Sequence, residues 1–353
     1  MKKLIPVILS VLLLSSCGSV PPQNEDKAAR TPADGMTTEE KVGQLFMVRC
    51  DSSNMDSVLE KQPGGIVMFA VDFENLSEND VKKKIKGYKK SCDIEPIIAV
   101  DEEGGTVVRV SSNPMLAPEK YKSPQFYYNE GGIEGTVQNT VEKSQLLSEL
   151  GITMNLAPVA DVSTDPSDFI YDRSLGQDAQ TTAEYIAAVT SAAKNEGIMS
   201  CLKHFPGYGN NADTHTGIAI DNRSLDSFRA NDFLPFESGI AAGAASVLVS
   251  HNIITAADPE EPASISPQIH SILRDELGFS GIIMTDDMSM QAMAEYETPY
   301  TRAVLAGNDM IIVSDFETAY SEVLAAVKSG EIPPQTLDKA VERILRVKAE
   351  YGI

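Results

Sequence analysis

The sequence is poor in basic residues relative to acidic ones, and its hydrophobic runs are short. It has 29 lysines and arginines against 51 aspartates and glutamates, which gives a formal net charge of −22. A surface this acidic repels nucleic acids and anionic lipid headgroups, so partners of these two classes are not expected. The apolar run at residues 4–14 is shorter than the ~20 residues that a membrane-spanning helix requires.

Cysteine and histidine are also scarce, with four of each in the chain. Neither a Cys-x-x-Cys nor a His-x-x-x-His spacing occurs, so the sequence predicts no metal site. Cys50 follows one predicted strand whereas Cys92 precedes another, which places them at opposite ends of a parallel barrel and excludes a disulfide between them. Cys201 lies inside a predicted strand and is expected to be a buried apolar residue.

The N-terminus has the features of an export signal. Lys2 and Lys3 precede the apolar run, which ends in the sequence Leu-Ser-Ser-Cys at Cys17. This ending resembles a bacterial lipobox, with Cys17 as the lipidated first residue of the mature chain; the alternative is an ordinary signal peptide with an incidental cysteine. We expect a signal peptide at 1–16, a flexible tether at 17–35, and an exported protein anchored to the cell membrane by lipid alone.

Short apolar runs recur along residues 36–353 and are typical of strands buried on both faces of a parallel sheet. They are residues 44–49, 65–69, 97–101, 154–158, 199–204, 246–251, 282–286 and 310–314. Helical patterns occupy residues 141–150, 183–196, 266–277, 288–294 and 334–348. Eight strands alternating with helices predict the α/β class, as a single (β/α)8 barrel of the TIM type over residues 36–353. A doubly wound sheet is the alternative, although it usually has about five to seven strands.

Polar residues stand at or beside the carboxyl ends of these predicted strands. They are Asp101, Asn155, Lys203, His204, Ser250, His251 and Asp286. Because these strand ends converge on one face of a barrel, where barrel enzymes build their active sites, the pattern predicts an enzyme. Taken singly, Asp101 and Asp286 could instead be turn or helix-capping acids, and Arg173 could form a surface ion pair.

One loop carries an unusual concentration of chemically active side chains. Lys203 and His204 begin it, Asp213 and His215 follow, and Gly207 is one of the glycines between them. These glycines suggest a loop that can fold over a ligand. The plain alternative is a solvated surface loop with polar residues, but two of the four histidines in one short segment favour a site for binding or proton transfer.

Several motifs follow one another along the chain in an order that resembles a known family. They lie at residues 36–46, 64–69, 100–105, 155–162, 203–207, 213–215, 285–290, 306–310 and 343–348. Together they resemble bacterial glycoside hydrolases of family 3, in the single-domain β-N-acetylglucosaminidase branch. Lys-His-Phe-Pro-Gly followed by Asp-x-His is the most specific part, because it marks this branch.

The resemblance implies a role for each matching residue. Asp286 would be the nucleophile of a retaining reaction, and His215, polarised by Asp213, the general acid/base. The residues implied to bind the N-acetylglucosamine unit are Asp101, Arg109, Arg173, Lys203 and His204. The family requires no metal or organic cofactor, and its expected substrates are terminal β-linked N-acetylglucosamine units of peptidoglycan fragments.

The chain departs from the family pattern at two positions, and two other functions remain open. Tyr208 stands where a histidine or arginine is common, and Thr214 where a serine is usual. A phosphorylase would use the same glycosyl-enzyme but intercept it with phosphate. The sugar-binding lipoprotein of an importer would share the anchor and the acidic surface, but it would have two lobes and need no nucleophile.

Overall fold

The protein is described by a computed structural model that covers residues 32–49, 54–209, 217 and 219–353. The predicted signal peptide, Cys17, Cys50, Asp213 and His215 lie outside these residues. Pro32–Ile353 forms one compact unit. Pro32–Gly35 forms a short 3-10 helix, in which Ala33 is buried.

Eight parallel strands form one sheet, as predicted. In sheet order they are β10 (Ile311–Val313), β1 (Phe46–Arg49), β2 (Gly65–Met68), β3 (Ile97–Val100), β4 (Met154–Asn155), β5 (Met199–Phe205), β7 (Ser246–Val249) and β9 (Ile282–Thr285). The two ends of this order approach each other, because Met284 of β9 bridges to Met310 beside β10 and the N–H of Thr285 donates to the carbonyl of Met310 at 3.2 Å. The sheet is therefore a nearly closed barrel, and the doubly wound alternative is wrong.

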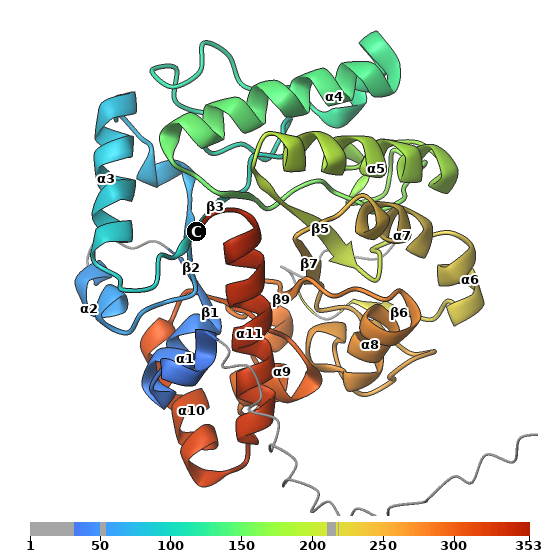
Figure 1. The fold of residues 1–353 in the computed structure, drawn as a ribbon. Coiled ribbons are helices and arrows are strands. Elements are labelled where there is room, and N and C mark those ends of the chain that lie inside the picture. The colour runs from blue at the N-terminus through green and yellow to red at the C-terminus, as the bar shows by residue number, and fades with distance from the viewer. Residues whose placement is uncertain (1–31, 50–53, 210–216, 218) are drawn as a thin grey trace, which may run out of the picture. The chain divides into compact units, whose positions relative to one another are not determined.

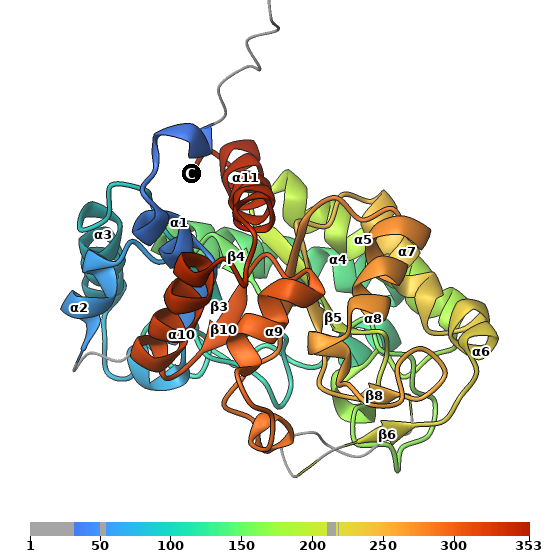
Figure 2. The ribbon, with the colours of Figure 1, turned by 90° about the horizontal axis from the view of Figure 1, so that it is seen from below.

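Helices surround the barrel strands (Figures 1 and 2). They are α1 (Thr38–Gln44), α2 (Met55–Glu60), α3 (Glu78–Lys90), α4 (Pro124–Leu150), α5 (Ala179–Asn195), α6 (Leu225–Ala230), α7 (Phe233–Ala241), α8 (Pro267–Ser271), α9 (Pro299–Ala306), α10 (Phe316–Ser329) and α11 (Pro334–Glu350). A small parallel pair, β6 (Ile220–Asp221) with β8 (Ile253–Ile254), lies beside the barrel sheet. One barrel leaves no pair of lobes, so the importer-protein alternative is wrong as well.

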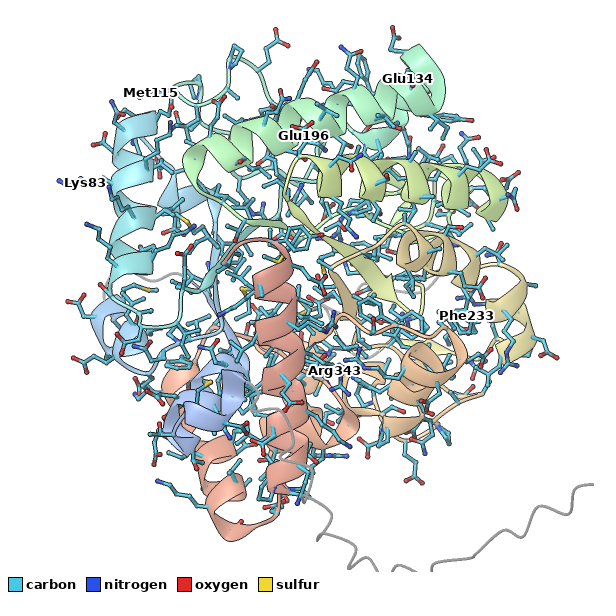
Figure 3. All side chains as sticks on the ribbon, in the orientation of Figure 1. Lys83, Met115, Glu134, Glu196, Phe233 and Arg343 are labelled. Atoms are coloured by element: carbon cyan, nitrogen blue, oxygen red, sulfur yellow. The ribbon has the colours of Figure 1, made fainter. Side chains whose placement is uncertain are left out.

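Continuous burial explains why these apolar runs form the strands of the barrel. Every residue of β2, β3, β7 and β9 is buried, as a parallel sheet covered by helices on its outer face requires. Cys201 of β5 is a fully buried free thiol, which confirms its predicted apolar role. Charged side chains such as Lys83 on α3 and Glu134 on α4 are exposed and point away from the barrel (Figure 3).

One predicted helix is not formed. Residues 288–294 adopt a loop with the 3-10 turn Gln291–Met293, because Met290 has an extended backbone (φ −64°, ψ 147°) and the N–H groups of Met293 and Ala294 bond three residues back. The N–H of Met288 donates to the carbonyl of Ile312 at 3.1 Å, and that of Ser289 donates to Asp287 Oδ1 at 2.9 Å. Across the described part of the chain, no helix combines the length and the apolar character needed to cross a membrane.

Lys348 of α11 is fully buried, and this should make stability depend on pH. Its Nζ donates to Gln44 Oε1 at 2.8 Å, and burial lowers the pKa of Lys348 to about 7. The unfolded chain therefore binds this proton more strongly than the folded one above about pH 7, so stability rises with pH from there towards 10.5. In Lys348→Met, we expect the gain in unfolding free energy between pH 7 and pH 9 to be smaller by on the order of 2 kcal/mol.

Urea unfolding of both proteins at the two pH values measures this difference. Lys339→Met, at an exposed lysine on the same helix, is the matched control and should keep the wild-type gain. Equal gains in wild type and Lys348→Met would contradict the prediction.

Candidate active site

A cavity of about 220 Å³ lies at the carboxyl ends of the barrel strands. Apolar side chains form part of its wall, among them Phe69, Leu156, Leu248 and Ile312. The polar residues that line it are Asp101, Glu103, Arg109, Arg173, Lys203, His204, Asp286 and Asp287. The structure thus brings six of the predicted site residues together, from strand β5 and from loops far apart in the sequence. Asp213 and His215 lie outside the described residues, so their predicted roles stay predictions.

Lys203 lies at the centre of a charged network. It is near the end of β5, its side chain is only 3% exposed, and its Nζ lies 2.7 Å from Asp101 Oδ1 and 2.6 Å from Glu103 Oε1. Burial alone would lower the pKa of Lys203, but Asp101 and Glu103 outweigh burial and raise it. Lys203 is therefore a fixed positive charge at neutral pH, held between two carboxylates.

Glu103 is a site residue that the sequence did not single out. Its buried carboxylate accepts hydrogen bonds from Arg173 Nε at 3.0 Å and Arg173 Nη2 at 2.8 Å, in addition to its contact with Lys203. Burial raises the pKa of Glu103, but the two cations outweigh it and hold the pKa well below the ordinary value. Glu103 thus orients both cations. The available signal was its position two residues after Asp101, in the turn that follows β3.

His204 is held by a second buried carboxylate, Asp161. Asp161 Oδ2 accepts from the N–H of His204 at 3.0 Å and lies 2.8 Å from its Nδ1, while His204 Nε2 lies 3.2 Å from Arg173 Nη2. A proton on Nδ1 facing Asp161 leaves Nε2 as an acceptor towards Arg173. Asp161 belongs to a motif that the sequence pointed to, but its contact with His204 could not be inferred from spacing.

Glu102 and Asn155 position the loop that carries Arg109. The carboxylate of Glu102 is buried and accepts the N–H groups of Arg109 at 2.8 Å and Val110 at 2.7 Å. Asn155, at the end of β4, accepts the N–H of Glu102 at 2.9 Å and donates to its carbonyl at 3.0 Å. Asn155 therefore acts on the loop through Glu102, and Val107 and Arg109 of that loop line the cavity.

The guanidinium of Arg109 is only partly engaged. It stacks 5.5 Å from the ring centre of Phe69, and its Nη2 lies 3.9 Å from Asp101 Oδ2. Among the described residues, its buried Nε has no hydrogen-bond partner. Buried donors are normally satisfied, so this free N–H is suited to an acceptor on a ligand.

Asp286 follows β9 and extends into the same cavity. Its Oδ1 accepts the N–H of Asp287 at 2.9 Å. Burial raises the pKa of Asp286. Nearby groups lower it by more than burial raises it, so the net shift is downward. These groups are His204, His251, the N–H of Asp287 and Lys203. The carboxylate is therefore ionised at neutral pH, as a nucleophile must be.

His251, just after β7, contacts Asp287, the residue after Asp286, and does not itself line the cavity. Its Nδ1 lies 2.7 Å from Ser264 Oγ and its Nε2 lies 3.1 Å from the carbonyl of Asp287. His251 is fully buried and does not line the cavity. It therefore holds the turn of Asp286 and Asp287 against the barrel wall.

Tyr208 is a packing residue of the site. Its side chain is 1% exposed and its ring meets that of His204 edge-on, with centroids 5.1 Å apart. Its N–H donates to Asp161 Oδ1 at 2.8 Å. Gly207 beside it has φ +120°, and a Cβ there would lie 2.6 Å from Asp232 Oδ1, so this glycine permits close packing. The described groups hold no cluster of three or more metal-ligating side chains.

Comparison with known proteins gives a consistent family. The family described as Glycosyl hydrolase family 3 N terminal domain matches residues 37–347. A Beta-hexosaminidase of Nitrosomonas eutropha is 30% identical over 277 residues, which are 75% of this chain and 77% of that protein. Beta-hexosaminidase LpqI of Mycobacterium tuberculosis is 29% identical over 329 residues, 89% of this chain and 83% of that protein.

A solved structure agrees with these relatives. It is a family 3 beta-N-acetylglucosaminidase from a Paenibacillus strain, and it superposes with a TM-score of 0.84 at 28% identity. The match covers 90% of this chain and 63% of that one. The family match over most of the chain, the barrel and the cavity at its carboxyl end lead to one conclusion: the chain belongs to glycosyl hydrolase family 3 and is a glycoside hydrolase.

Proposed function

We propose that this enzyme is a retaining exo-β-N-acetylglucosaminidase with Asp286 as its nucleophile. The observation that carries the proposal is the ionised carboxylate of Asp286 in a cavity lined by Arg109, Arg173, Lys203 and His204. The relatives named as β-hexosaminidases support this substrate class. A carboxylate facing several polar side chains and apolar walls suits attack on a sugar carbon.

The proposed reaction has two displacements. First, a carboxylate oxygen of Asp286 bonds to the anomeric carbon, the glycosidic C–O bond breaks, and His215 gives its proton to the leaving oxygen. Then water attacks the same carbon, His215 takes a proton from that water, and the bond to Asp286 breaks. Two inversions release the sugar with its β configuration retained. Asp213 would hold the tautomer of His215 and raise its basicity.

The other cavity side chains would hold the sugar. Carboxylate Asp101 can accept hydrogen bonds from hydroxyls, whereas Arg109, Arg173 and Lys203 can donate to hydroxyl or acetamido oxygens. Their fixed mutual contacts mean that little reorganisation is needed when the sugar binds. This preorganisation is what places the anomeric carbon within reach of Asp286.

The proposed natural substrates are peptidoglycan fragments that end in β-linked N-acetylglucosamine, and the proposed location is the outer side of the cell membrane. The lipobox-like sequence at Cys17 supports an anchor made of lipid alone. An enzyme held there meets fragments of the cell wall. Metabolic labelling of the expressed protein with a radioactive fatty acid tests the anchor.

The activity is tested with 4-nitrophenyl β-N-acetylglucosaminide and the matching β-glucoside. We expect nitrophenol release from the first and little from the second, with free N-acetylglucosamine as the sugar product. Formation of N-acetylglucosamine 1-phosphate in phosphate buffer would show the phosphorylase reaction instead. Binding without turnover would contradict the proposed function.

His215→Ala should show a dependence on the leaving group. Without the proton donor, we expect kcat/KM for a poor leaving group to fall about 10²–10⁴-fold, whereas a 2,4-dinitrophenyl glycoside, which leaves without protonation, should lose far less in its first step. Steady-state kinetics with both substrates gives the comparison. Equal losses for both would remove His215 from the acid/base role.

A further inference from the structure

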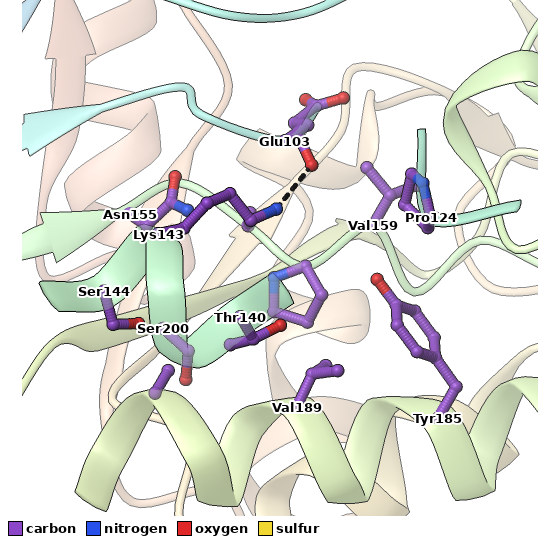
Figure 4. Close-up of a pocket in the computed structure, with 13 residues that line it drawn as sticks. Glu103, Pro124, Thr140, Lys143, Ser144, Asn155, Val159, Tyr185, Val189 and Ser200 are labelled. Carbon is purple, nitrogen blue, oxygen red and sulfur yellow. Dashed lines mark hydrogen bonds between the residues drawn. The ribbon is translucent and has the colours of Figure 1, made fainter. Parts of the chain in front are cut away.

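A second, smaller cavity lies behind the side chains that line the active-site cavity. It measures about 30 Å³, enough for one water molecule, and it is lined by residues of α4, α5, β4 and β5 (Figure 4). The polar side chains around it include Thr140, Lys143, Ser144, Tyr185 and Ser200. Its wall also contains Glu103, so this cavity adjoins the network that holds Lys203 and Arg173.

Lys143 crosses from helix α4 to this network. It is buried, and its Nζ donates to the main-chain carbonyl of Glu103 at 2.8 Å (Figure 4). The groups that face it are Glu102 and Glu103 from the loop after β3, the ring of Tyr121 with its centre 5.9 Å from Nζ, and Tyr185 of α5. Burial lowers the pKa of Lys143 to about 8, against the opposing effect of the two carboxylates.

Three neighbours of Lys143, namely Tyr121, Tyr185 and Glu103, stay in one charge state over the range in which the lysine titrates. Burial raises the pKa of Tyr121 to about 12 and raises that of Tyr185 further, so both phenols remain neutral at pH 8. The pKa of Glu103 lies far below this range. A change of charge near pH 8 in this part of the structure therefore falls on the ammonium of Lys143.

Two carboxylates in front of Lys143 orient the cations of the active site. Glu103 binds Lys203 and Arg173, and Glu102 binds the main-chain N–H groups of the segment that carries Arg109. We propose that Lys143 is a positioning residue for sugar binding: its charged ammonium fixes the Glu102–Glu103 turn from behind and thereby sets Arg109, Arg173 and Lys203. This inference rests on the proposed function, since it assumes that these cations bind the sugar.

A purely structural role for Lys143 predicts different behaviour. If the lysine only joined α4 to the loop, its loss would lower stability and leave the affinity of the folded enzyme for sugar unchanged. A positioning role predicts that affinity follows the charge of Lys143. Burying a lysine without a carboxylate in direct contact is costly, which makes its presence for packing alone unfavourable.

The test is the pH dependence of N-acetylglucosamine binding, measured by isothermal titration calorimetry at pH 7 and pH 9.5. In the wild type, we expect the Kd to rise roughly tenfold between these values, as the charge-assisted hydrogen bond from Lys143 weakens to that of a neutral amine. Lys143→Met should bind weakly at both pH values. Lys143→Arg keeps its charge, has the adjoining cavity to accept its larger head, and should bind tightly at both.

Lys194→Met, at an exposed lysine on α5, is the matched control and should keep the wild-type pH dependence. Thermal unfolding of each variant establishes that it is folded at the temperature of the titration. Should Lys143→Met not fold, Lys143→Arg alone decides, because wild-type weakening at pH 9.5 in this variant would overturn the inference. The same pH dependence in wild type and Lys143→Met would also overturn it. No binding of N-acetylglucosamine to the wild type would instead contradict the proposed function itself.

Discussion

Asp286→Ala is expected to lower kcat by at least about 10⁴-fold on a β-N-acetylglucosaminide, because the proposed covalent route loses its nucleophile. The cavity that remains keeps Lys203, His204 and Arg173, so a small anion can enter beside the sugar. Azide should therefore restore part of the activity with an activated aryl glycoside. The product should be the α-configured glycosyl azide, since a single displacement inverts the anomeric carbon.

The wild-type enzyme provides a further check through its pH profile. Because the pKa of Asp286 is lowered from 3.8, the decline in kcat/KM that comes from its protonation should lie below that value.

Asp315→Ala is the matched control for Asp286→Ala. Asp315 is an exposed carboxylate just after the neighbouring strand β10, where it accepts the N–H of Thr318 at the start of α10. Its loss should change activity less than about twofold while costing ~1 kcal/mol of stability. Full activity in Asp286→Ala would contradict its assignment as the nucleophile.

Glu103→Gln is expected to lower both activity and stability. The buried carboxylate is shared by Lys203 and Arg173, and a neutral amide leaves these two cations without their common counter-charge. Breaking a buried ion pair in this way costs about 3–5 kcal/mol of unfolding free energy. We also expect kcat/KM to fall about 10²-fold, because small displacements of the two cations that we propose bind the sugar would misplace the anomeric carbon.

The stability effect should depend on pH. The pKa of Glu103 is lowered in the folded state, so its contribution is present in full above the unfolded value of about 4.5 and is lost as pH falls through the folded value. Urea unfolding at pH 7 should therefore show the full difference between wild type and Glu103→Gln. Glu134→Gln, at an exposed glutamate of α4, is the control and should match the wild type in both kinetics and unfolding. A Glu103→Gln enzyme with wild-type stability at pH 7 would show that the carboxylate carries no net stabilisation.

The strands of the barrel were predictable because a parallel sheet covered by helices buries both faces of each strand. This produces continuous apolar runs, such as the one that became β3, and it leaves little room for other interpretations. The helix expected at residues 288–294 failed for the opposite reason. Its apolar pattern was suitable, but Met290 has an extended backbone, and the N–H of Met288 ties the segment to the carbonyl of Ile312, a residue that no local pattern identifies.

Some residues of the candidate site could likewise be predicted from the sequence, whereas others could not. Asp101, Lys203, His204 and Asp286 were identified because each follows or ends a predicted strand. The contacts of Glu103 and Asp161 were missed, because each depends on the direction of a side chain and on a partner from another strand. The roles of Asp213 and His215 remain predictions from the family resemblance.

The sequence by itself determined the eight-stranded barrel and the family, and it predicted the end of the barrel at which the candidate site lies. Periodic burial and ordered motifs are local properties of the chain and can be read without coordinates. The tertiary structure decided which contacts each of the three acidic residues in the turn after β3 makes. Asp101 contacts Lys203 in the cavity, Glu102 holds backbone N–H groups, and Glu103 joins Lys203 to Arg173. Successive side chains in a turn point in different directions, so only the positions of their distant partners assign each one its contact.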